Sequence, residues 1–149
     1  MAVLRARPYG NQRFLVDLGT GNTAAPEAAF CEVILPGISI DVIEYRTGSD
    51  KEDGVNKLPG LARYPDVTLR RGIIGSLDVY NWINEVRNGS PNARRTVTIQ
   101  LLSEDGTPVL TWKLLRAWPS KFSGPALDAK GTDVAMEELV LSYERLEME

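Results

Sequence analysis

Alternation of apolar and polar residues with a period of two is the feature that most limits what this 149-residue chain can fold into. Such a period places successive apolar side chains on one face of an extended strand. The apolar members of the alternating segments are Phe14, Val16 and Leu18; Ile38, Ile40 and Val42; Val67 and Leu69; Val97, Ile99 and Leu101; and Leu110, Trp112 and Leu114. Together with a candidate strand at residues 30–35, they predict a mainly β domain built from half-buried strands.

Two details predict how these strands continue and pair. The turn sequence Glu104-Asp105-Gly106 stands between two alternating runs, so residues 97–101 and 110–114 should form a β-hairpin. After Val42 the alternation changes phase, because Ile43 and Tyr45 become the apolar positions. We therefore expect a β-bulge at that point.

One segment has the period of a helix. Its apolar residues follow the i, i+3, i+4, i+7 spacing, and they are Val79, Trp82, Ile83 and Val86. Ser76 is the expected N-cap, and the carboxylate of Asp78 suits the positive end of the helix dipole. Asn88-Gly89 is the expected C-terminal stop, so the sequence predicts one amphipathic helix.

The segment that follows Asp133 fits two patterns. A helix would place Met136, Val140 and Tyr143 on one side, whereas a strand would align Leu139, Leu141 and Tyr143. Intrinsic propensity favours the helix. An open sheet, however, needs a further strand to cover its edge, and for this reason we favour the strand.

Composition excludes several classes of protein. The formal net charge is −3 and the pI is near 5.1, so no general basic field indicates nucleic-acid binding. The single cysteine, Cys31, has apolar neighbours, and we expect it to be buried in a protein of a reducing compartment. No apolar run reaches the roughly 18–20 residues of a membrane span. Met1–Gln12 has no apolar signal core, so Sec export is not expected.

The chain contains no histidine, which removes the commonest general base and the usual catalytic triads. The acidic cluster of Asp50, Glu52 and Asp53 lacks the later glutamate of an EF-hand loop. Gly19-Thr-Gly-Asn is followed by no phosphate-binding glycine motif, so we interpret it as a turn. An enzyme that used only carboxylates would need two of them at a distinctive spacing, and the sequence offers no such pair. We therefore expect no catalytic, cofactor or metal site.

The remaining basic and aromatic clusters have ordinary structural interpretations. Arg70-Arg71 and Arg94-Arg95 are not interleaved with aromatic residues, so each pair is expected on a solvated strand face or at a subunit contact. Trp112 and Trp118 lie on or beside a predicted strand and are expected in the core or at an interface.

The stretch EYRTGSDKEDGVNKLPG, from Glu44 to Gly60, is too long for a common hairpin connection of about 2–5 residues. Its charges have both signs. Mixed charges suit a polar contact with a complementary surface, which a neighbouring copy of the chain can supply. A mobile hairpin loop without a partner is the alternative interpretation.

A series of short sequence blocks runs in order from about residue 30 to the C-terminus. The blocks are Val42-Ile-Glu-Tyr-Arg, Lys57-Leu-Pro-Gly-Leu, Asp66-Val-Thr-Leu-Arg-Arg-Gly-Ile, Leu77-Asp-Val-Tyr-Asn-Trp-Ile, Leu101-Leu-Ser-Glu-Asp-Gly-Thr-Pro-Val, Trp112-Lys-Leu-Leu-Arg-Ala-Trp-Pro-Ser-Lys, Gly124-Pro-Ala-Leu-Asp-Ala-Lys-Gly and Val134-Ala-Met-Glu-Glu-Leu. In this order they resemble the tail tube proteins of contractile-tailed phages and of phage-derived contractile injection systems. The chain departs from that pattern at Gly19–Ala28, which is longer and richer in alanine and proline, and at Pro36.

The resemblance implies an all-β domain with one α-helix, in which two packed antiparallel sheets form a sandwich or barrel-like tube-protein fold. A single domain would span residues 1–149, with an N-terminal arm at 1–12 and an extended hairpin loop at 46–57. The last segment would then be a strand, and the helix around Trp82 would lie on the outer side of the tube.

The resemblance also implies a non-enzymatic structural subunit of an inner tail tube. Six copies would form a ring, and stacked rings would form a conduit for DNA or effectors inside a contractile sheath. The implied partners are other copies of the chain, the sheath protein, baseplate or hub proteins, tube-terminator proteins, and a tape-measure protein, effector cargo or DNA in the lumen. No cofactor and no membrane binding are implied. Assembly would take place in the bacterial cytoplasm, before incorporation in a phage tail or an injection-system particle.

On this basis we predict that the charged loop and two arginines of the N-terminal arm contact neighbouring subunits. The predicted contact residues are Arg46, Thr47, Asp50, Lys51, Glu52, Asp53, Asn56, Lys57, Arg5 and Arg7. Glu44-Tyr45 and Leu58-Pro59-Gly60 are expected to act as hinges of the loop. A small β-sandwich module that binds a ligand or a peptide is the alternative function.

Overall fold

The computed structural model describes residues 2–20, 29–35, 37–49 and 54–149 of the chain. Nine strands and one helix follow one another in this part of the chain. They are β1 (Phe14–Asp17), β2 (Glu32–Ile34), β3 (Ser39–Tyr45), β4 (Asn56–Arg63), β5 (Val67–Gly72), α1 (Asp78–Arg87), β6 (Arg95–Leu102), β7 (Pro108–Ser123), β8 (Met136–Ser142) and β9 (Arg145–Met148). The predicted all-β class with one helix is confirmed.

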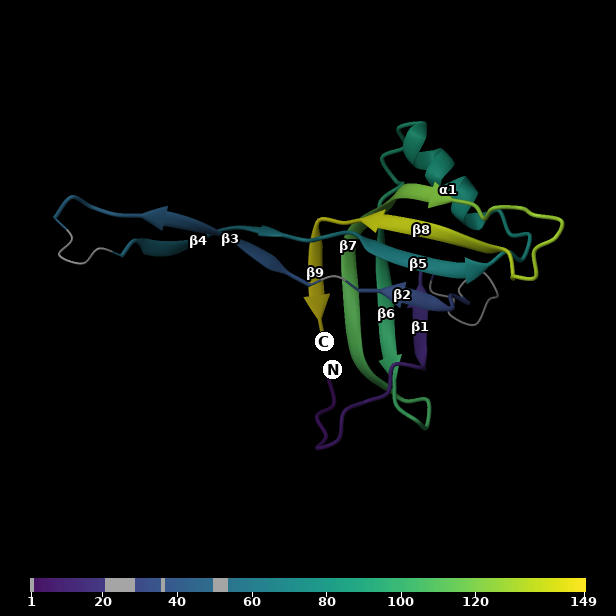
Figure 1. Cartoon of the computed structure of the whole chain (residues 1–149), viewed down its shortest axis with the longest axis horizontal. Coiled ribbons are helices and arrows are strands. Elements are labelled where there is room, and N and C mark those ends of the chain that lie inside the picture. Colours follow the sequence, from purple (N-terminus) through teal and green to yellow (C-terminus); the bar gives the residue numbers. More distant parts are fainter. Residues whose placement is uncertain (1, 21–28, 36, 50–53) are drawn as a thin grey trace.

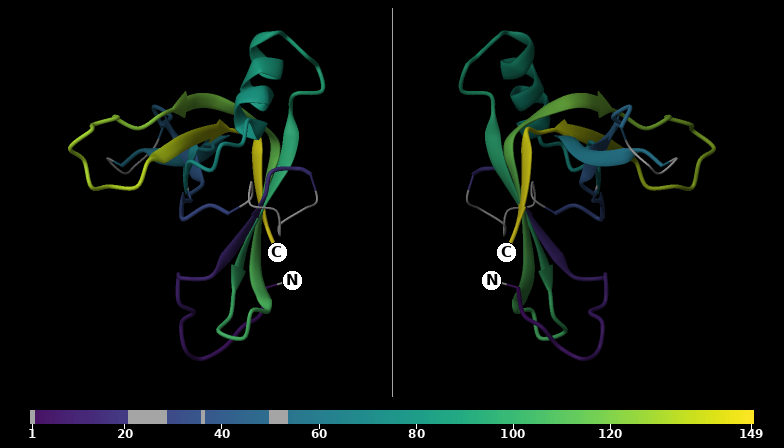
Figure 2. Two further views of the ribbon diagram at one scale, coloured as in Figure 1. Left: turned by 90° about the vertical axis from the view of Figure 1, so that its right-hand side faces the viewer. Right: turned by 90° about the vertical axis from the view of Figure 1, so that its left-hand side faces the viewer.

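The body of the domain consists of two antiparallel sheets that share the long strand β7 (Figure 1). The first half of β7 pairs with β6 and β9, and β6 also pairs with β1. The second half pairs with β8, which continues through β5 to β2. Figure 2 shows that the two groups of strands run in different directions. The strand therefore connects both layers of the predicted two-sheet fold.

The change of sheet along β7 occurs from Arg116 to Trp118, where Ala117 still pairs with Arg95 of β6. Leu115 still pairs with Arg145 of β9, whereas Trp118 already pairs with Ser142 of β8. Arg116 lies between these pairs and has a φ of 54°, in the left-handed region that non-glycine residues seldom occupy. Because its backbone turns there, one continuous strand can serve two layers.

The core lies between the two sheets and under the helix. Most of its side chains are aliphatic and lie on the strand faces that the alternation predicted to be buried. Its members include Val16, Leu18, Val67, Leu69, Val97, Ile99, Leu114, Leu139 and Leu141. Val79 and Trp82 of the helix are buried in this core, as the helical spacing of the apolar residues predicted. Trp112 is partly buried against this core, in line with its expected place.

The helix begins one residue later than its sequence indicated. Leu77 is the N-cap, without a capping side chain, so the prediction that Ser76 caps the helix is wrong. The hydroxyl of Ser76 instead lies 3.3 Å from the amide nitrogen of Asp78 and donates to the Asp78 carboxylate at 2.9 Å. The predicted C-terminal stop is confirmed, because Asn88 is the C-cap and Gly89 has a φ of 76°.

The predicted hairpin and the preferred C-terminal strand are both confirmed. Val97 pairs with Leu114 and Leu101 with Leu110 across β6 and β7. The C-terminal segment forms β8 and β9, although its intrinsic propensity favours a helix. As a strand, β8 lies between β5 and β7 and buries Leu139 and Leu141, so tertiary packing outweighs local propensity.

Two predicted placements are wrong. Cys31 is exposed, because Phe30 takes the inward position beside the edge strand β2 and the next side chain must point outward. Arg71 is buried at 1% exposure rather than solvated, because it continues the inward face of β5 after Val67 and Leu69. Its neighbour Arg70 is on the solvated face, as predicted.

Candidate subunit-interface surfaces

A two-stranded hairpin projects from one end of the body (Figure 1). It consists of β3 and β4, from Ser39 to Arg63, and we call it the hairpin arm. Its pairs run from Ser39↔Arg63 near the body to Tyr45↔Asn56 near the tip. The two strands form a sheet of their own, separate from the two sheets of the body.

Local sequence explains the irregular pairing of the hairpin arm. The register shifts between Ile40 and Val42, so the bulge expected from the change of phase is present. Pro59 lies opposite Val42, where its missing N–H is tolerated because both strands are edge strands. A side chain on Gly60 would meet the carbonyl oxygen of Asp41 and Cγ1 of Ile43 at 3.1 Å, so these neighbours would have to move by a few tenths of an ångström to admit it.

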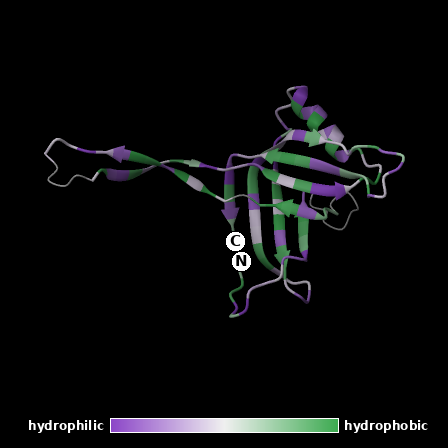
Figure 3. Cartoon of the chain, in the orientation of Figure 1, coloured by the Kyte–Doolittle hydropathy of each residue, from purple (hydrophilic) through white to green (hydrophobic). Residues whose placement is uncertain are grey.

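The hairpin arm exposes apolar side chains on both of its faces. Those at least half exposed are Ile40, Val42, Ile43, Tyr45, Leu58 and Leu61. The expectation of one half-buried face is therefore wrong, because no sheet of the same chain packs against the ribbon in the described residues. Figure 3 shows apolar residues along the half of the hairpin arm nearest the body. An isolated two-stranded ribbon is marginally stable in water, and exposed apolar patches mark interaction sites. The hairpin arm thus has the chemistry of an interface element.

Residues of the predicted contact loop lie at and near the tip of this hairpin arm. Arg46 is exposed directly after β3, and the hydroxyl oxygens of Thr47 and Ser49 lie 3.3 Å apart. Asn56 and Lys57 belong to β4 and pair with the end of β3. Asp50, Lys51, Glu52 and Asp53 lie outside the described residues.

The structure places the residues predicted as hinges within strands. Glu44-Tyr45 and Leu58-Pro59-Gly60 are paired strand residues inside the hairpin arm. The extended element is therefore longer than its charged sequence indicated, because pairing continues from the loop back to Ser39 and Arg63. At this base the Arg63 guanidinium lies 2.9 Å from the Asp41 carboxylate.

The predicted contact residues Arg5 and Arg7 lie on the N-terminal arm, apart from the hairpin arm. Arg5 donates to both carboxylate oxygens of Glu104 at 2.8 Å and to the carbonyl oxygen of Arg7 at 2.7 Å. Its guanidinium also stacks 3.8 Å from the ring centre of Tyr9. The hydrogen bond from Arg5 lowers the pKa of Glu104 to about 2. Arg5 therefore attaches the N-terminal arm to the β6–β7 turn. The structure does not bring Arg5 together with the predicted contact residues at the tip of the hairpin arm.

The first sheet of the body ends in two strands with one partner each. Within the described residues β1 pairs only with β6, and β9 pairs only with β7. Reciprocal backbone hydrogen bonds of 2.9 Å between Thr111 and Glu149 continue the pairing of β9 to the C-terminus. Each outer edge presents backbone groups that another strand can pair with.

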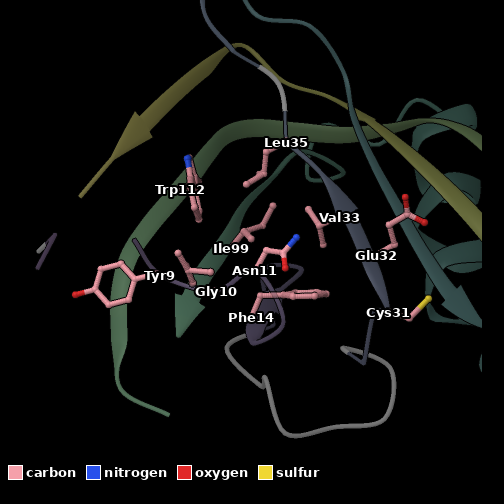
Figure 4. A pocket seen from close by; sticks show the side chains of 11 residues that line it. Tyr9, Gly10, Asn11, Phe14, Cys31, Glu32, Val33, Leu35, Ile99 and Trp112 are labelled. Atoms are coloured by element: carbon pink, nitrogen blue, oxygen red, sulfur yellow. The ribbon is translucent and has the colours of Figure 1, made fainter. Parts of the chain in front are cut away.

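A cavity of about 390 Å³ opens between β2 and the first sheet (Figure 4). Phe14, Leu35, Ile99 and Trp112 give it a mainly apolar lining. Its one carboxylate, Glu32, lies 3.7 Å from the guanidinium of Arg70. The thiol of Cys31 also lines it and donates to the carbonyl oxygen of Arg70 at 3.4 Å.

Among the residues with described positions, no group of three or more His, Cys, Asp or Glu side chains is arranged to hold a metal ion. In the same part of the chain, the helix is too short and too polar to cross a bilayer.

Comparison with known proteins identifies the family. The sequence profile of the T4-like virus tail tube protein gp19 matches residues 10–147. A chain of the sheath-tube complex of the extracellular contractile injection system PVC, in its extended state, is 31% identical with a TM-score of 0.82, and the match covers 97% of this chain and 93% of that one. No curated protein sequence matches the chain.

Two further solved structures agree with this assignment. A chain of the sheath/tube terminator of the PVC system, in its extended state, is 31% identical with a TM-score of 0.81. The match covers 96% of this chain and 97% of that one. A chain of the anti-feeding prophage baseplate is 25% identical with a TM-score of 0.80, and the match covers 97% of both chains. The chain belongs to the tail tube protein family. It is a structural subunit of a tail tube.

Sequence reasoning located the loop but missed the apolar body of the hairpin arm. A signal was present, because apolar residues occupy both phases of β3 and therefore both faces. Pro59-Gly60 inside an extended segment was a second signal, since this pair is typical of an edge strand.

Proposed function

We propose that copies of this chain assemble into hexameric rings, and that stacked rings form a conduit inside a contractile sheath. The hairpin arm carries this proposal, because its half-exposed apolar residues need a covering surface that the same chain does not supply in its described part. The contacts with neighbouring subunits include Arg46, Thr47, Asp50, Lys51, Glu52, Asp53, Asn56 and Lys57 of its tip, and Arg5 and Arg7 of the N-terminal arm.

Ring closure uses the free edges of the first sheet. β1 at one side and β9 at the other leave backbone donors and acceptors for a further strand. β9 of one copy pairs with β1 of the next, which removes both edges and makes the contact heterologous. Repeated around a ring, this pairing joins the sheets of all copies into one wall.

The partners follow from the assemblies in which similar chains occur. Those chains come from sheath-tube, baseplate and sheath/tube terminator structures, so the sheath, baseplate and terminator proteins are the proposed partners here. The lumen conducts DNA, a tape-measure protein or effector cargo. The chain has no enzymatic role, and it assembles in the bacterial cytoplasm.

A loop replacement tests the proposal. Tyr45 and Asn56 form the last pair of the hairpin arm, so an Asn-Gly turn joining them replaces residues 46–55 without disturbing β3 or β4. We expect a folded monomer that forms fewer or shorter tubes in electron micrographs. A Gly/Ser loop of the original length is the matched control, because it separates side-chain chemistry from loop length. Assembly equal to the natural chain in both variants would overturn the proposed role of the loop.

The cavity between β2 and the first sheet favours a second candidate function. Its volume of about 390 Å³ and its aromatic lining suit a small apolar ligand or the side chains of a peptide. A binding module keeps its ligand affinity as a monomer, whereas a tube subunit loses its function when assembly fails. Titration of the loop-replaced monomer with an environment-sensitive apolar dye distinguishes the two, since only a binding module gives saturable binding that a Trp112→Ala substitution removes.

A further inference from the structure

A second apolar surface lies at the end of the body opposite the hairpin arm (Figure 1). We call it the distal patch. It consists of Ile73, Ile74, Leu77 and Val134, which are 47%, 53%, 64% and 75% exposed. These residues come from two segments, the β5–α1 connection and the loop before β8.

The two segments of the distal patch are held together. The amide of Ile73 donates to the carbonyl oxygen of Ala135 at 2.9 Å, which continues the pairing of β5 with β8. The buried guanidinium of Arg71 forms ion pairs with Asp78 at the start of α1 and with Glu137 of β8. The patch is therefore a fixed surface of the folded body.

We propose that the distal patch receives the apolar base of the hairpin arm of a neighbouring copy. This inference rests on the proposed function, because it requires copies arranged in a row. Ile40 and Val42, which share one face of β3, are the residues that reach the patch. The occupant is thus a second copy of this chain.

The arrangement of the two surfaces in the fold supports this partner. A heterologous contact between identical subunits needs two different, complementary surfaces on each subunit. The hairpin arm leaves one end of the long axis and the distal patch lies at the other, so a displacement along this axis brings one toward the other (Figure 1). An eight-residue strand such as β4 spans about 26 Å, which lets it extend across a neighbour.

The chemistry of the two surfaces also matches. Ile40 and Val42 are aliphatic, and so are the four residues of the patch. Arg63 and Asp41 at the base of the hairpin arm already form an ion pair, so burial next to them leaves no unpaired charge. An aliphatic contact surrounded by charged residues is the usual organisation of a stable interface.

Disulfide cross-linking in the assembled particle tests the contact. In a Cys31→Ser background, two variants carry either Ile40→Cys or Val42→Cys on the hairpin arm, each together with Ile74→Cys on the patch. We expect mild oxidation after assembly to give a ladder of cross-linked subunits on a non-reducing gel. A mixture of the two single-cysteine variants should stop at dimers. Asn92→Cys in place of Ile74→Cys is the matched control, because Asn92 is exposed on the loop after α1, and it should give monomers.

The outcomes separate this inference from the proposed function. If the Cys31→Ser chain forms tubes but neither hairpin-arm position cross-links to the patch above the Asn92 control, the receiving surface is wrong and the tube function stands. If the Cys31→Ser chain and the natural chain form no rings or tubes, both proposals fail.

A charge substitution gives an independent test. Val134→Asp should reduce the yield of tubes at least tenfold relative to Asn92→Asp, which adds the same charge elsewhere. Both positions are exposed, so circular dichroism should report a natural fold for each variant. Normal tubes from Val134→Asp that no longer recruit the sheath protein would assign the patch to the sheath and overturn the inference.

Discussion

The guanidinium of Arg71 lies 2.6 Å from the carboxylate of Asp78, and this ion pair fastens the start of the helix to strand β5. Glu137 of β8 is the second acidic partner of the same guanidinium, which also lies 5.5 Å from the ring centre of Phe30. Burial alone would raise the pKa of Asp78, but hydrogen bonds from Arg71 and Ser76 outweigh it and lower that pKa below its ordinary value. One buried cation thus joins the helix to strands β5 and β8.

Removing this cation should destabilise the fold strongly. In Arg71→Met two partly buried carboxylates lose their partner, and the expected loss of unfolding free energy is about 3–5 kcal/mol. Urea denaturation followed by tryptophan fluorescence measures it. Arg70→Met is the matched control, because Arg70 is solvated and its ion pair with Glu138 at 3.0 Å is a surface contact worth at most about 1 kcal/mol. Equal losses in the two variants would contradict the account of Arg71.

Acid should release the N-terminal arm. The Arg5 hydrogen bond lowers the pKa of Glu104 from 4.5 to about 2 in the folded chain, so the contact is fully present above pH 4.5 and is lost as the pH falls toward 2. The amide of Val3, in the same arm, donates to the carbonyl oxygen of Val109 at 2.9 Å. Its protection from hydrogen exchange therefore shows whether the arm is held against the body. Hydrogen exchange should show protection of this amide at pH 6 that declines between pH 4.5 and 2.

The matched variant for this pH dependence is Glu104→Gln. It removes the carboxylate but keeps the shape of the side chain, so protection of the Val3 amide should be low and independent of pH over the same range. An unchanged decline in this variant would assign the effect to another group.

A side chain at Gly60 should disturb the hairpin arm without disturbing the body. Gly60→Ala puts a methyl group 3.1 Å from the Asp41 carbonyl oxygen and from Ile43, so the two strands must shift. We expect an unchanged melting temperature of the body and impaired tube formation in electron micrographs. Gly37→Ala meets no atom within 4 Å and serves as the control. Tubes of normal length from Gly60→Ala would show that the hairpin arm tolerates a change of register.

The hydroxyl of Tyr143 should be dispensable. It is buried, it has no hydrogen-bond partner among the described residues, and burial together with Asp66 and Tyr64 raises its pKa to about 12. Because an unpaired buried hydroxyl costs free energy, Tyr143→Phe should leave stability unchanged or raise it by about 1 kcal/mol. A clear loss in a denaturation curve would reveal a partner for the hydroxyl in the assembled or the isolated chain.

The core strands were predictable because their pattern is local. Val67 and Leu69 alternate with polar neighbours, and the buried face of β5 follows from that period alone. The same period places Arg71 on the inner face. Its partner Glu137 comes from another strand distant in the sequence, so a local pattern could not show that the charge is neutralised there.

The hairpin arm was predictable only in part. The phase change after Val42 predicted the bulge, but the extent of pairing from Ser39 to Arg63 depends on contacts between two strands that no local period reports. The charged composition of residues 46–57 drew attention to the tip, whereas the apolar faces nearer the body depend on a partner outside the chain. Burial of an interface element is therefore a property of the assembly.

Electron microscopy of the purified chain at high concentration tests the central claim most directly. A tube subunit whose hairpin arm and sheet edges meet neighbouring copies should form rings with sixfold symmetry or stacked tubes with a regular repeat along the axis. The same sample with sheath and baseplate proteins should give longer tubes. A chain that stays strictly monomeric under all these conditions would contradict the account.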